Sequence, residues 1–203
     1  MTTLYITRHG ETEWNIQSRF QGWKNSPLTE LGVKQAESLR KRMSTIPLNK
    51  IYTSPTERAA RTANIIRGDR DIQIVQDMDL REMGFGNWEG LTHDEIKSLN
   101  EVELNNLMYH PSKYVPDMGE DYKTFTERII GAVDRIILNH PKESVLIVTH
   151  GISLKVMLSY FNSLDLDEIH NLPIVGQASL TQVNINKDEF QVILTGDTQH
   201  YDF

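Results

Sequence analysis

The chain has 203 residues, of which 38% are hydrophobic and 24% charged, with a formal net charge of −7 at pH 7. This length and composition are typical of one globular domain with a full hydrophobic core, so we expect a single domain over 1–203. No apolar run approaches the roughly 20 residues that a membrane-spanning helix needs. A strand pattern begins within four residues of the N-terminus without a leader pattern, which predicts a cytoplasmic protein.

The chain contains no cysteine, which excludes disulfides, thiolate metal ligands and cysteine nucleophiles. The negative net charge argues against nucleic acid as a partner, because such binding depends on clustered Lys and Arg. An anionic ligand would therefore need a local basic pocket, and close groups of Arg and His become the informative residues.

The stretch 4–12 is an apolar strand pattern that ends in Arg8, His9 and Gly10. In α/β proteins such a strand presents reactive side chains at the carboxyl edge of a parallel sheet. Turn-forming and aromatic residues then predict an ordered loop over 10–27. Thr29 is expected to cap a helix from Glu30 to Ser44.

A short strand at Ile51 and Tyr52 precedes a strongly marked helix start. Ser54 is the expected N-cap, with Pro55 at the first helical position and Glu57 completing a capping box. Gly68 is placed to end this helix. Its first turn carries Arg58, where the helix dipole disfavours a cation, and this indicates either an anion nearby or a side chain in water.

Residues 72–75 alternate as a third strand, and the glycine-rich and aromatic segment 80–90 predicts a loop of functional size. Thr92 and Glu95 form a second capping box, which opens a polar helix to about Tyr109. Together with the exposed segment that follows, residues 91–120 predict a small helical cap beside the main sheet.

An amphipathic helix is expected from Asp121 to His140. The continuous apolar run at 144–149 is typical of a strand covered on both faces, and it ends in His150 and Gly151 before a helical pattern over 152–161. This repeats the arrangement at the N-terminus. Two strands that end in histidine and glycine would bring His9 and His150 to one edge of the sheet.

Residues 178–185 and 190–195 alternate as two late strands, and the Asn-Lys-Asp turn at 186–188 suggests a hairpin. The alternation of strands and helices before them predicts an α/β fold. We expect a three-layer α/β/α sandwich with a central, mostly parallel mixed sheet and the small helical cap.

Five segments of the chain, in order, resemble the successive motifs of the histidine phosphatase superfamily, also called the phosphoglycerate mutase-like family. They are TRHGETEWN at 7–15, QGWKNSPLTELGVKQA at 21–36, TSPTERAARTA at 53–63, LREMGFGNWEG at 80–90 and VTHG at 148–151. The resemblance covers most of the chain and implies one histidine phosphatase domain.

The resemblance also implies a role for each site residue. His9 would take the phosphoryl group onto its ring, and Glu82 would protonate the leaving oxygen and later activate water. The remaining members surround the phosphate or line the pocket, and they are Arg8, Arg58, His150, Asn15, Gln21, Gly22 and Gly151. The arginines supply the positive charge, so no metal and no cofactor are expected.

The function that this implies is hydrolysis of a small phosphorylated metabolite through a phospho-histidine, with inorganic phosphate as product. A cofactor-dependent phosphoglycerate mutase and a non-catalytic phosphate-binding protein are the alternatives. The mutases that this chain resembles carry a basic segment for a second phosphate, whereas the cap here is acidic. Binding alone would need neither His9 nor Glu82. The oligomeric state stays open.

Three further features leave alternatives. Glu89 is the alternative proton donor to Glu82, although an ion pair with an arginine is the favoured interpretation. A zinc site on His9 and His150 would need a further ligand at helical spacing, and none is present. Met118 to Asp121 departs from the Gly-Gly-Glu-Ser of related phosphatases in the segment expected to face the substrate.

Overall fold

The computed structural model describes residues 1–187 and 189–203 and contains one six-stranded sheet. The strand order is β3-β2-β4-β1-β5-β6, in which β3, β2, β4 and β1 pair in parallel and β5 pairs antiparallel with both β1 and β6. The strands are β1 (Thr2–Arg8), β2 (Lys50–Thr53), β3 (Ile74–Gln76), β4 (Ser144–Thr149), β5 (Leu180–Asn186) and β6 (Glu189–Asp197). The predicted mostly parallel mixed sheet is confirmed.

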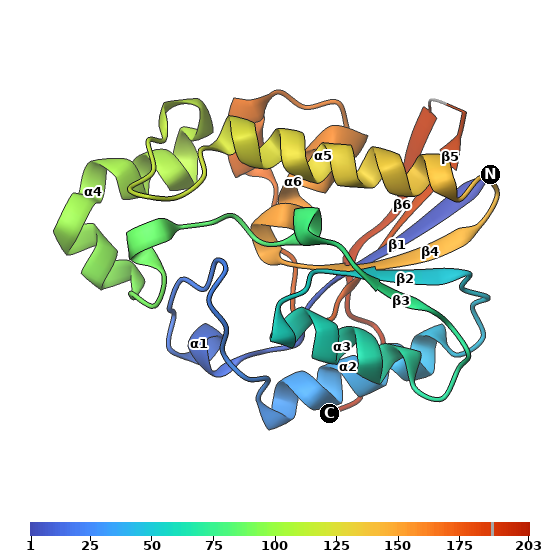
Figure 1. Cartoon of the computed structure of the whole chain (residues 1–203). Helices are drawn as coiled ribbons and strands as arrows, with labels where there is room; N and C mark the ends of the chain where they lie inside the picture. The colour runs from blue at the N-terminus through green and yellow to red at the C-terminus, as the bar shows by residue number, and fades with distance from the viewer. Residues whose placement is uncertain (188) are drawn as a thin grey trace.

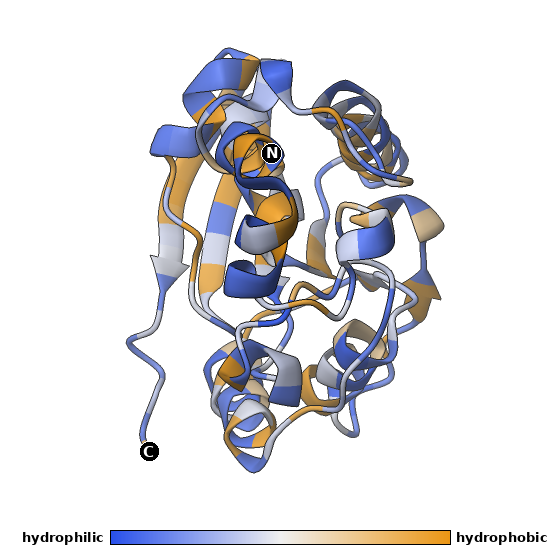
Figure 2. Ribbon diagram, turned by 90° about the vertical axis from the view of Figure 1, so that its left-hand side faces the viewer, coloured by the Kyte–Doolittle hydropathy of each residue, from blue (hydrophilic) through white to orange (hydrophobic). Residues whose placement is uncertain are grey.

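Helices cover both faces of this sheet, with α2 and α3 on one side and α5 and α6 on the other (Figure 1). The helices are α1 (Glu13–Ile16), α2 (Glu30–Met43), α3 (Glu57–Arg67), α4 (His93–Tyr109), α5 (Tyr122–Asn139) and α6 (Gly151–Phe161). Figure 2 shows that polar and apolar residues alternate along these ribbons, as surface helices over a core require. The predicted three-layer sandwich is confirmed.

The central strand β4 divides the core into two layers. Val145 and Ile147 belong to the apolar cluster under α5 and α6, whereas Leu146 and Val148 belong to the cluster under α2 and α3. All four side chains are fully buried. Successive residues of a strand point to opposite faces, so an uninterrupted apolar run is the pattern of a strand covered on both sides.

The N-terminus of α3 differs from the prediction. The N-cap is Thr56 and the helix begins at Glu57, so Ser54 and Pro55 lie before it. The Ser54 amide still donates to Val148 O in the sheet at 3.0 Å, which keeps this residue in extended backbone. Its hydroxyl lies 2.8 Å from Nε2 of His150 instead of capping the helix. The predicted capping box is therefore wrong.

Smaller differences concern short elements. The predicted loop after β1 contains α1, whose N-cap Thr12 forms a capping box with Asn15. A four-residue helix is too short to produce a periodic pattern. Strand β3 begins at Ile74 rather than at residue 72. The predicted hairpin joins β5 and β6, but its turn residue Asp188 lies outside the described residues.

The capping box of Thr92 and Glu95 is present at the start of α4, which bends at Asn100. Asp121 caps α5 by accepting from the Thr124 amide, which a serine would also do. The departure at 118–121 thus leaves this helix start intact. Within the described residues, no helix is both long and apolar enough to cross a membrane.

The segment after β1 lies directly against the first turn of α2. A Cβ on Gly32 would come within 2.1 Å of the Glu11 carbonyl oxygen, and one on Gly10 within 2.4 Å of the Gly32 oxygen. The amide of Gly10 also donates to the Thr62 hydroxyl at 3.0 Å. Both glycines are needed for this close approach, which places the backbone that follows His9.

Replacing Gly32 by alanine should destabilise the protein by about 1–3 kcal/mol, because backbone must move to admit the methyl group. The matched variant Gly131→Ala lies inside α5, where the nearest atom to a new Cβ is 3.9 Å away. It should stabilise by about 0.5–1 kcal/mol through helix propensity. Denaturant midpoints measure both, and a Gly32→Ala protein as stable as wild type would contradict the packing described.

Candidate active site

Two adjacent strands bring the predicted histidines together. Strands β1 and β4 pair in parallel with Arg8 opposite Thr149, so His9 and His150 both follow at the same edge. Their ring centroids lie 5.2 Å apart in an edge-to-face arrangement. The sequence-based expectation that two strand ends meet at one edge agrees with this geometry.

A pocket of about 190 Å³ opens beside these rings. Among the predicted site residues it is lined by Arg8, His9, Asn15, Gln21, Gly22, Arg58, Glu82 and Gly151. His150 is fully buried next to His9 and is not one of the residues that line the cavity. The structure thus brings together all nine predicted site residues: eight line the cavity, and the ninth, His150, lies behind His9.

His9 is held as a neutral imidazole. Its Nδ1 donates to the Gly10 carbonyl oxygen at 2.7 Å, which leaves the lone pair on Nε2. Burial, followed by the charges of Arg58 and Arg8, lowers the pKa of His9 well below its ordinary value. A neutral ring with a free Nε2 is the form that can act as a nucleophile.

Arg58 is 1% exposed although it carries a charge. Its Nη1 and Nη2 donate to the carbonyl oxygens of Lys24 and Gly22, each at 2.7 Å. Burial and the charge of Arg8 lower the pKa of Arg58 to about 10, opposed by Glu82 and Glu89, so it stays protonated near neutral pH. Its Nε is buried without a hydrogen-bond partner in the part of the chain that is described.

Arg8 has the same arrangement. Its Nη1 donates to the Val175 carbonyl oxygen at 3.1 Å, while Nε is buried and has no partner among residues 1–187 and 189–203. Burial lowers the pKa of Arg8. Two guanidinium groups with unsatisfied N–H groups at one pocket form a site for an anion, because buried donors without partners are costly.

Glu82 lies at the N-terminus of α6. Its Oε1 accepts from the amides of Met83 and Ser153 and from the Ser153 hydroxyl, and Oε2 accepts from the Ile152 amide, all at 3.0–3.1 Å. The free amides of a first helical turn suit a carboxyl group. These hydrogen bonds fix the orientation of Glu82 at the wall of the pocket. Its Oε2 accepts one of them, from the Ile152 amide.

The backbone around Glu82 is held by Arg128. This guanidinium donates to the carbonyl oxygens of Asp79 and Glu82 and forms a 2.6 Å ion pair with Glu120. Glu120 in turn accepts from the Gly84 amide. None of residues 118–121 lines the pocket, so this segment does not face it as predicted. The loop of Glu82 is supported by Glu120, a residue that matches the related phosphatases, and not by the departing residues Met118 and Asp121.

Glu89 also has a different role from the one predicted. It forms no ion pair with an arginine in the described structure. Its carboxylate accepts from the amides of Trp23, Lys24 and Phe85 at 2.9–3.2 Å. Glu89 thereby joins the loop that holds Arg58 to the loop that carries Glu82.

Asn15 and Gln21 are joined through Thr12. The Asn15 Oδ1 accepts from the Thr12 amide, and the Gln21 Nε2 donates to the Thr12 hydroxyl at 2.9 Å. The Gln21 Oε1 is buried without a partner among the described residues. This short network orients two polar side chains that line the pocket.

Five further residues that line the pocket were not among the predicted site residues. They are Arg19, Phe20, Phe85, Ile152 and Ile174. Arg19 donates to the Gly90 carbonyl oxygen at 2.6 Å and pairs with Glu95 at 3.3 Å, so its charge is largely compensated. Arg19 and Phe20 directly precede Gln21, so their place in the sequence could have indicated that they line the same pocket. Ile174 comes from a distant loop that no motif marks.

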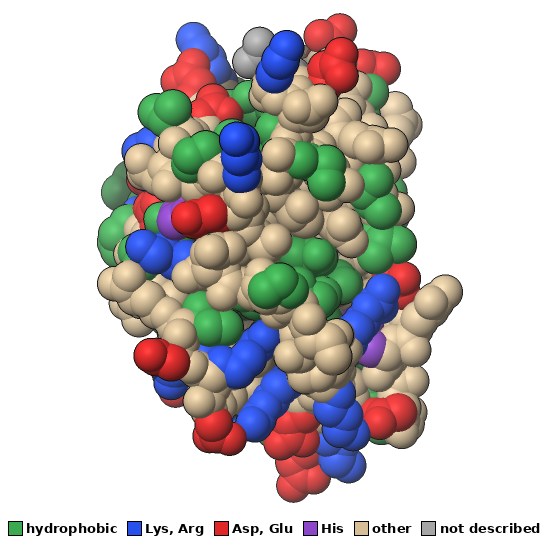
Figure 3. Space-filling view, turned by 90° about the vertical axis from the view of Figure 1, so that its right-hand side faces the viewer, with side chains coloured by type: hydrophobic (Ala, Val, Ile, Leu, Met, Phe, Trp, Pro, Cys, Tyr) green, Lys and Arg blue, Asp and Glu red, His purple; other side chains and the backbone are tan. Residues whose placement is uncertain are grey.

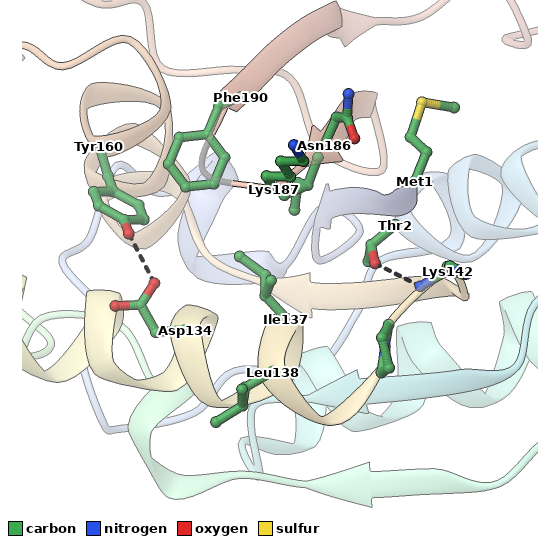
Figure 4. Close-up of a pocket in the computed structure, with 12 residues that line it drawn as sticks. Met1, Thr2, Asp134, Ile137, Leu138, Lys142, Tyr160, Asn186, Lys187 and Phe190 are labelled. Carbon is green, nitrogen blue, oxygen red and sulfur yellow. Dashed lines mark hydrogen bonds between the residues drawn. The ribbon is translucent and has the colours of Figure 1, made fainter.

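A wider groove of about 780 Å³ lies at the opposite end of the sheet, between α5 and the β5–β6 hairpin (Figure 4). Its single carboxylate, Asp134, accepts from the Tyr160 hydroxyl, and its described lining holds no His or Arg. On the face at that end, Lys and Arg side chains gather mainly in the lower half, with others near the top among the hydrophobic ones (Figure 3). Eight of the nine predicted site residues line the smaller pocket instead.

Among the described residues, no group of three or more His, Asp or Glu side chains is arranged to hold a metal ion. The positive charge at the pocket comes from Arg8 and Arg58, with neutral imidazoles beside them. A parallel sheet edge with this donor set defines a class of phosphoryl-binding α/β proteins.

The chain belongs to the histidine phosphatase superfamily (branch 1), whose family model matches residues 4–198. It is 43% identical to YhfR of Bacillus stearothermophilus, whose structure superposes with a TM-score of 0.95 over 98% of this chain and 99% of that one. It is 29% identical to the uncharacterized phosphatase PhoE of Bacillus subtilis, covering 95% of this chain and 93% of that protein.

A third relative is the probable phosphoglycerate mutase GpmB of Cronobacter sakazakii, 34% identical over 78% of this chain and 74% of that protein. The predicted superfamily and fold are confirmed by these comparisons, and so is the predicted phosphatase activity.

Proposed function

We propose that this chain is a metal-independent phosphomonoester hydrolase of the cytoplasm, which acts on a small phosphorylated metabolite through a phosphoryl group on His9. The observation that carries the proposal is the pair of buried guanidinium Nε atoms, on Arg8 and Arg58, that have no partner among the described residues and lie beside a neutral His9 whose Nε2 is unprotonated. Relatives named as phosphatases support it.

In the bound state the substrate phosphate accepts from the guanidinium groups of Arg8 and Arg58 and from the Asn15 side chain. The backbone amide of Gly151 adds a further donor at the start of α6. These groups are fixed by the protein before substrate arrives, so they stabilise the equatorial oxygens of the transition state without reorganisation. The arginines supply the charge that a metal ion would otherwise provide.

The reaction proceeds in two displacements. Nε2 of His9 attacks phosphorus, the bond from phosphorus to the ester oxygen breaks, and protonated Glu82 transfers its proton to that oxygen. The alcohol leaves. Glu82 then removes a proton from water as the water oxygen attacks phosphorus, the phosphorus–nitrogen bond breaks, and inorganic phosphate is released with His9 and protonated Glu82 restored.

The five further lining residues favour hydrolysis over a mutase reaction. A mutase must hold a second phosphate near the first, but the cation among these five, Arg19, is already paired with Glu95. The remaining wall is formed by the apolar side chains of Phe20, Phe85, Ile152 and Ile174. A second dianion would lose water there without gaining comparable partners.

His9→Ala should abolish hydrolysis of a chromogenic phosphate ester, because no other side chain lining the pocket can replace its free ring nitrogen. Wild-type activity should be unchanged in excess EDTA. With 3-phosphoglycerate and catalytic 2,3-bisphosphoglycerate, we expect release of inorganic phosphate and no 2-phosphoglycerate. Activity that survives His9→Ala or disappears in EDTA would contradict the proposal, and steady isomerisation would replace it with the mutase.

Glu82→Gln should separate the two displacements. An alkyl phosphate needs a proton on its leaving oxygen, so its kcat/KM should fall by about 10²–10⁴. A nitrophenyl phosphate has a stable leaving anion, and its kcat/KM should stay within about tenfold of wild type. Its turnover should show a burst of one nitrophenol per site, followed by slow hydrolysis of the phosphoenzyme.

The matched control is Glu89→Gln, a carboxylate in the same loop that bonds to backbone amides and does not line the pocket. Any loss there should be equal for the alkyl and the nitrophenyl ester. If Glu82→Gln also lowers both esters equally and shows no burst, Glu82 is not the proton donor.

A further inference from the structure

The hydroxyl of Ser54 is a buried polar group in contact with His150, and the proposed function gives it no role. Ser54 is fully buried at the end of β2, and its Oγ lies 2.8 Å from Nε2 of His150. It does not cap α3, whose N-cap is Thr56. Its amide is already paired with Val148 O in the sheet. The contact with the imidazole is therefore the shortest hydrogen bond of this hydroxyl.

The neighbours of Ser54 favour donation of its proton to His150. The Thr56 amide lies 3.4 Å from the Ser54 Oγ as a donor, and the Thr56 hydroxyl lies 3.2 Å away. Both can donate to Ser54, whose own proton is then directed to the imidazole Nε2. The Thr56 hydroxyl also lies 3.4 Å from this Nε2, a longer contact than the 2.8 Å of Ser54. In that arrangement Nε2 accepts, and the proton of a neutral His150 must lie on Nδ1.

His150 is neutral in this environment. Burial, followed by the charges of Arg58, His9 and Arg8, lowers its pKa well below the ordinary value. A neutral imidazole has one N–H, and its position decides whether the ring donates to an anion or repels it. Nδ1 is buried without a partner in the described part of the chain. His150 does not line the cavity, but its ring centroid lies 5.2 Å from that of His9. An N–H on Nδ1 could therefore donate to a phosphoryl group carried by His9, whereas a lone pair could not.

We propose that Ser54 is a positioning residue, whose hydroxyl donates to Nε2 of His150 and holds the neutral ring in the tautomer that presents an Nδ1–H to the transferred phosphoryl group. This rests on the proposed function, since it assigns His150 to the phosphate. Ser54 itself touches neither substrate nor reacting atoms. It acts through the ring, because its hydrogen bond to Nε2 keeps a donor on Nδ1 although the imidazole is neutral.

The test uses nitrogen NMR of the ¹⁵N-histidine-labelled full chain, which distinguishes protonated from bare ring nitrogens whether or not the protein turns over substrate. In the wild type near neutral pH, we expect His150 to be protonated on Nδ1 and bare on Nε2. Ser54→Ala should give a mixture of tautomers, and Ser54→Thr, which keeps the hydroxyl, should restore the wild-type pattern.

The affinity for inorganic phosphate is the second readout. Ser54→Ala should weaken phosphate binding and lower kcat/KM by about 10–100-fold, as expected for loss of one oriented donor. Ser54→Thr should recover most of this. The matched control is Ser38→Ala, which removes a buried serine hydroxyl bonded to Asp202 outside the pocket. It should leave phosphate affinity and the His150 signals unchanged.

A wild-type His150 protonated on Nε2 would overturn the proposal, even if no Ser54 variant folds. So would a Ser54→Ala protein with unchanged tautomer and phosphate affinity. If the wild type neither binds phosphate nor hydrolyses esters, the proposed function fails, and the tautomer measurement still reports separately on the Ser54 to His150 bond.

Discussion

The site depends on burying cationic donors without giving each a partner. Arg58 is almost completely enclosed, yet no carboxylate forms an ion pair with it among the described residues. Backbone carbonyl oxygens hold its two terminal nitrogens, and one holds a terminal nitrogen of Arg8. Desolvating charge in this way costs several kcal/mol per group, and the cost is recovered when an anion enters. The donors that line this pocket thus suit an anion.

The same positive charge keeps both histidines neutral. A protonated His9 or His150 would add a third cation to a buried cluster that already holds two. For His9 this leaves an unprotonated Nε2, because its other nitrogen donates to Gly10 O. The start of α6 connects this cluster to the acid, because His150 caps the helix and its next amides hold Glu82.

Much of this arrangement follows from local sequence. An apolar run that ends in Arg8 and His9, and a second that ends in His150, predict two buried strands with reactive residues at one edge. The prediction at Ser54 failed for a physical reason. A serine, a proline and a glutamate satisfy the local pattern of a capping box, but the hydroxyl found a stronger partner in His150, which is 96 residues away. Rules for helix capping use only neighbouring residues, so they cannot predict a hydrogen bond to a residue far away in the sequence.

Sequence patterns also miss contacts at the pocket that form between distant loops. Ile174 reaches the pocket from the loop before β5, and Glu95 reaches Arg19 from α4. Neither contact has a sequence period or a motif, since it arises only when separate loops are packed. The interpretation of residues 91–120 as a cap insertion of one domain stays a prediction, as do the roles of the individual site residues.

The account is tested most directly by a crystal structure with phosphate or vanadate bound. We predict one anion in the pocket, with oxygens within hydrogen-bond distance of Nε of both Arg8 and Arg58. The central atom should lie in line with Nε2 of His9 at about 3–3.5 Å, or closer for bonded vanadate. An anion bound elsewhere, or one bound here with both Nε atoms still lacking partners, would contradict the account.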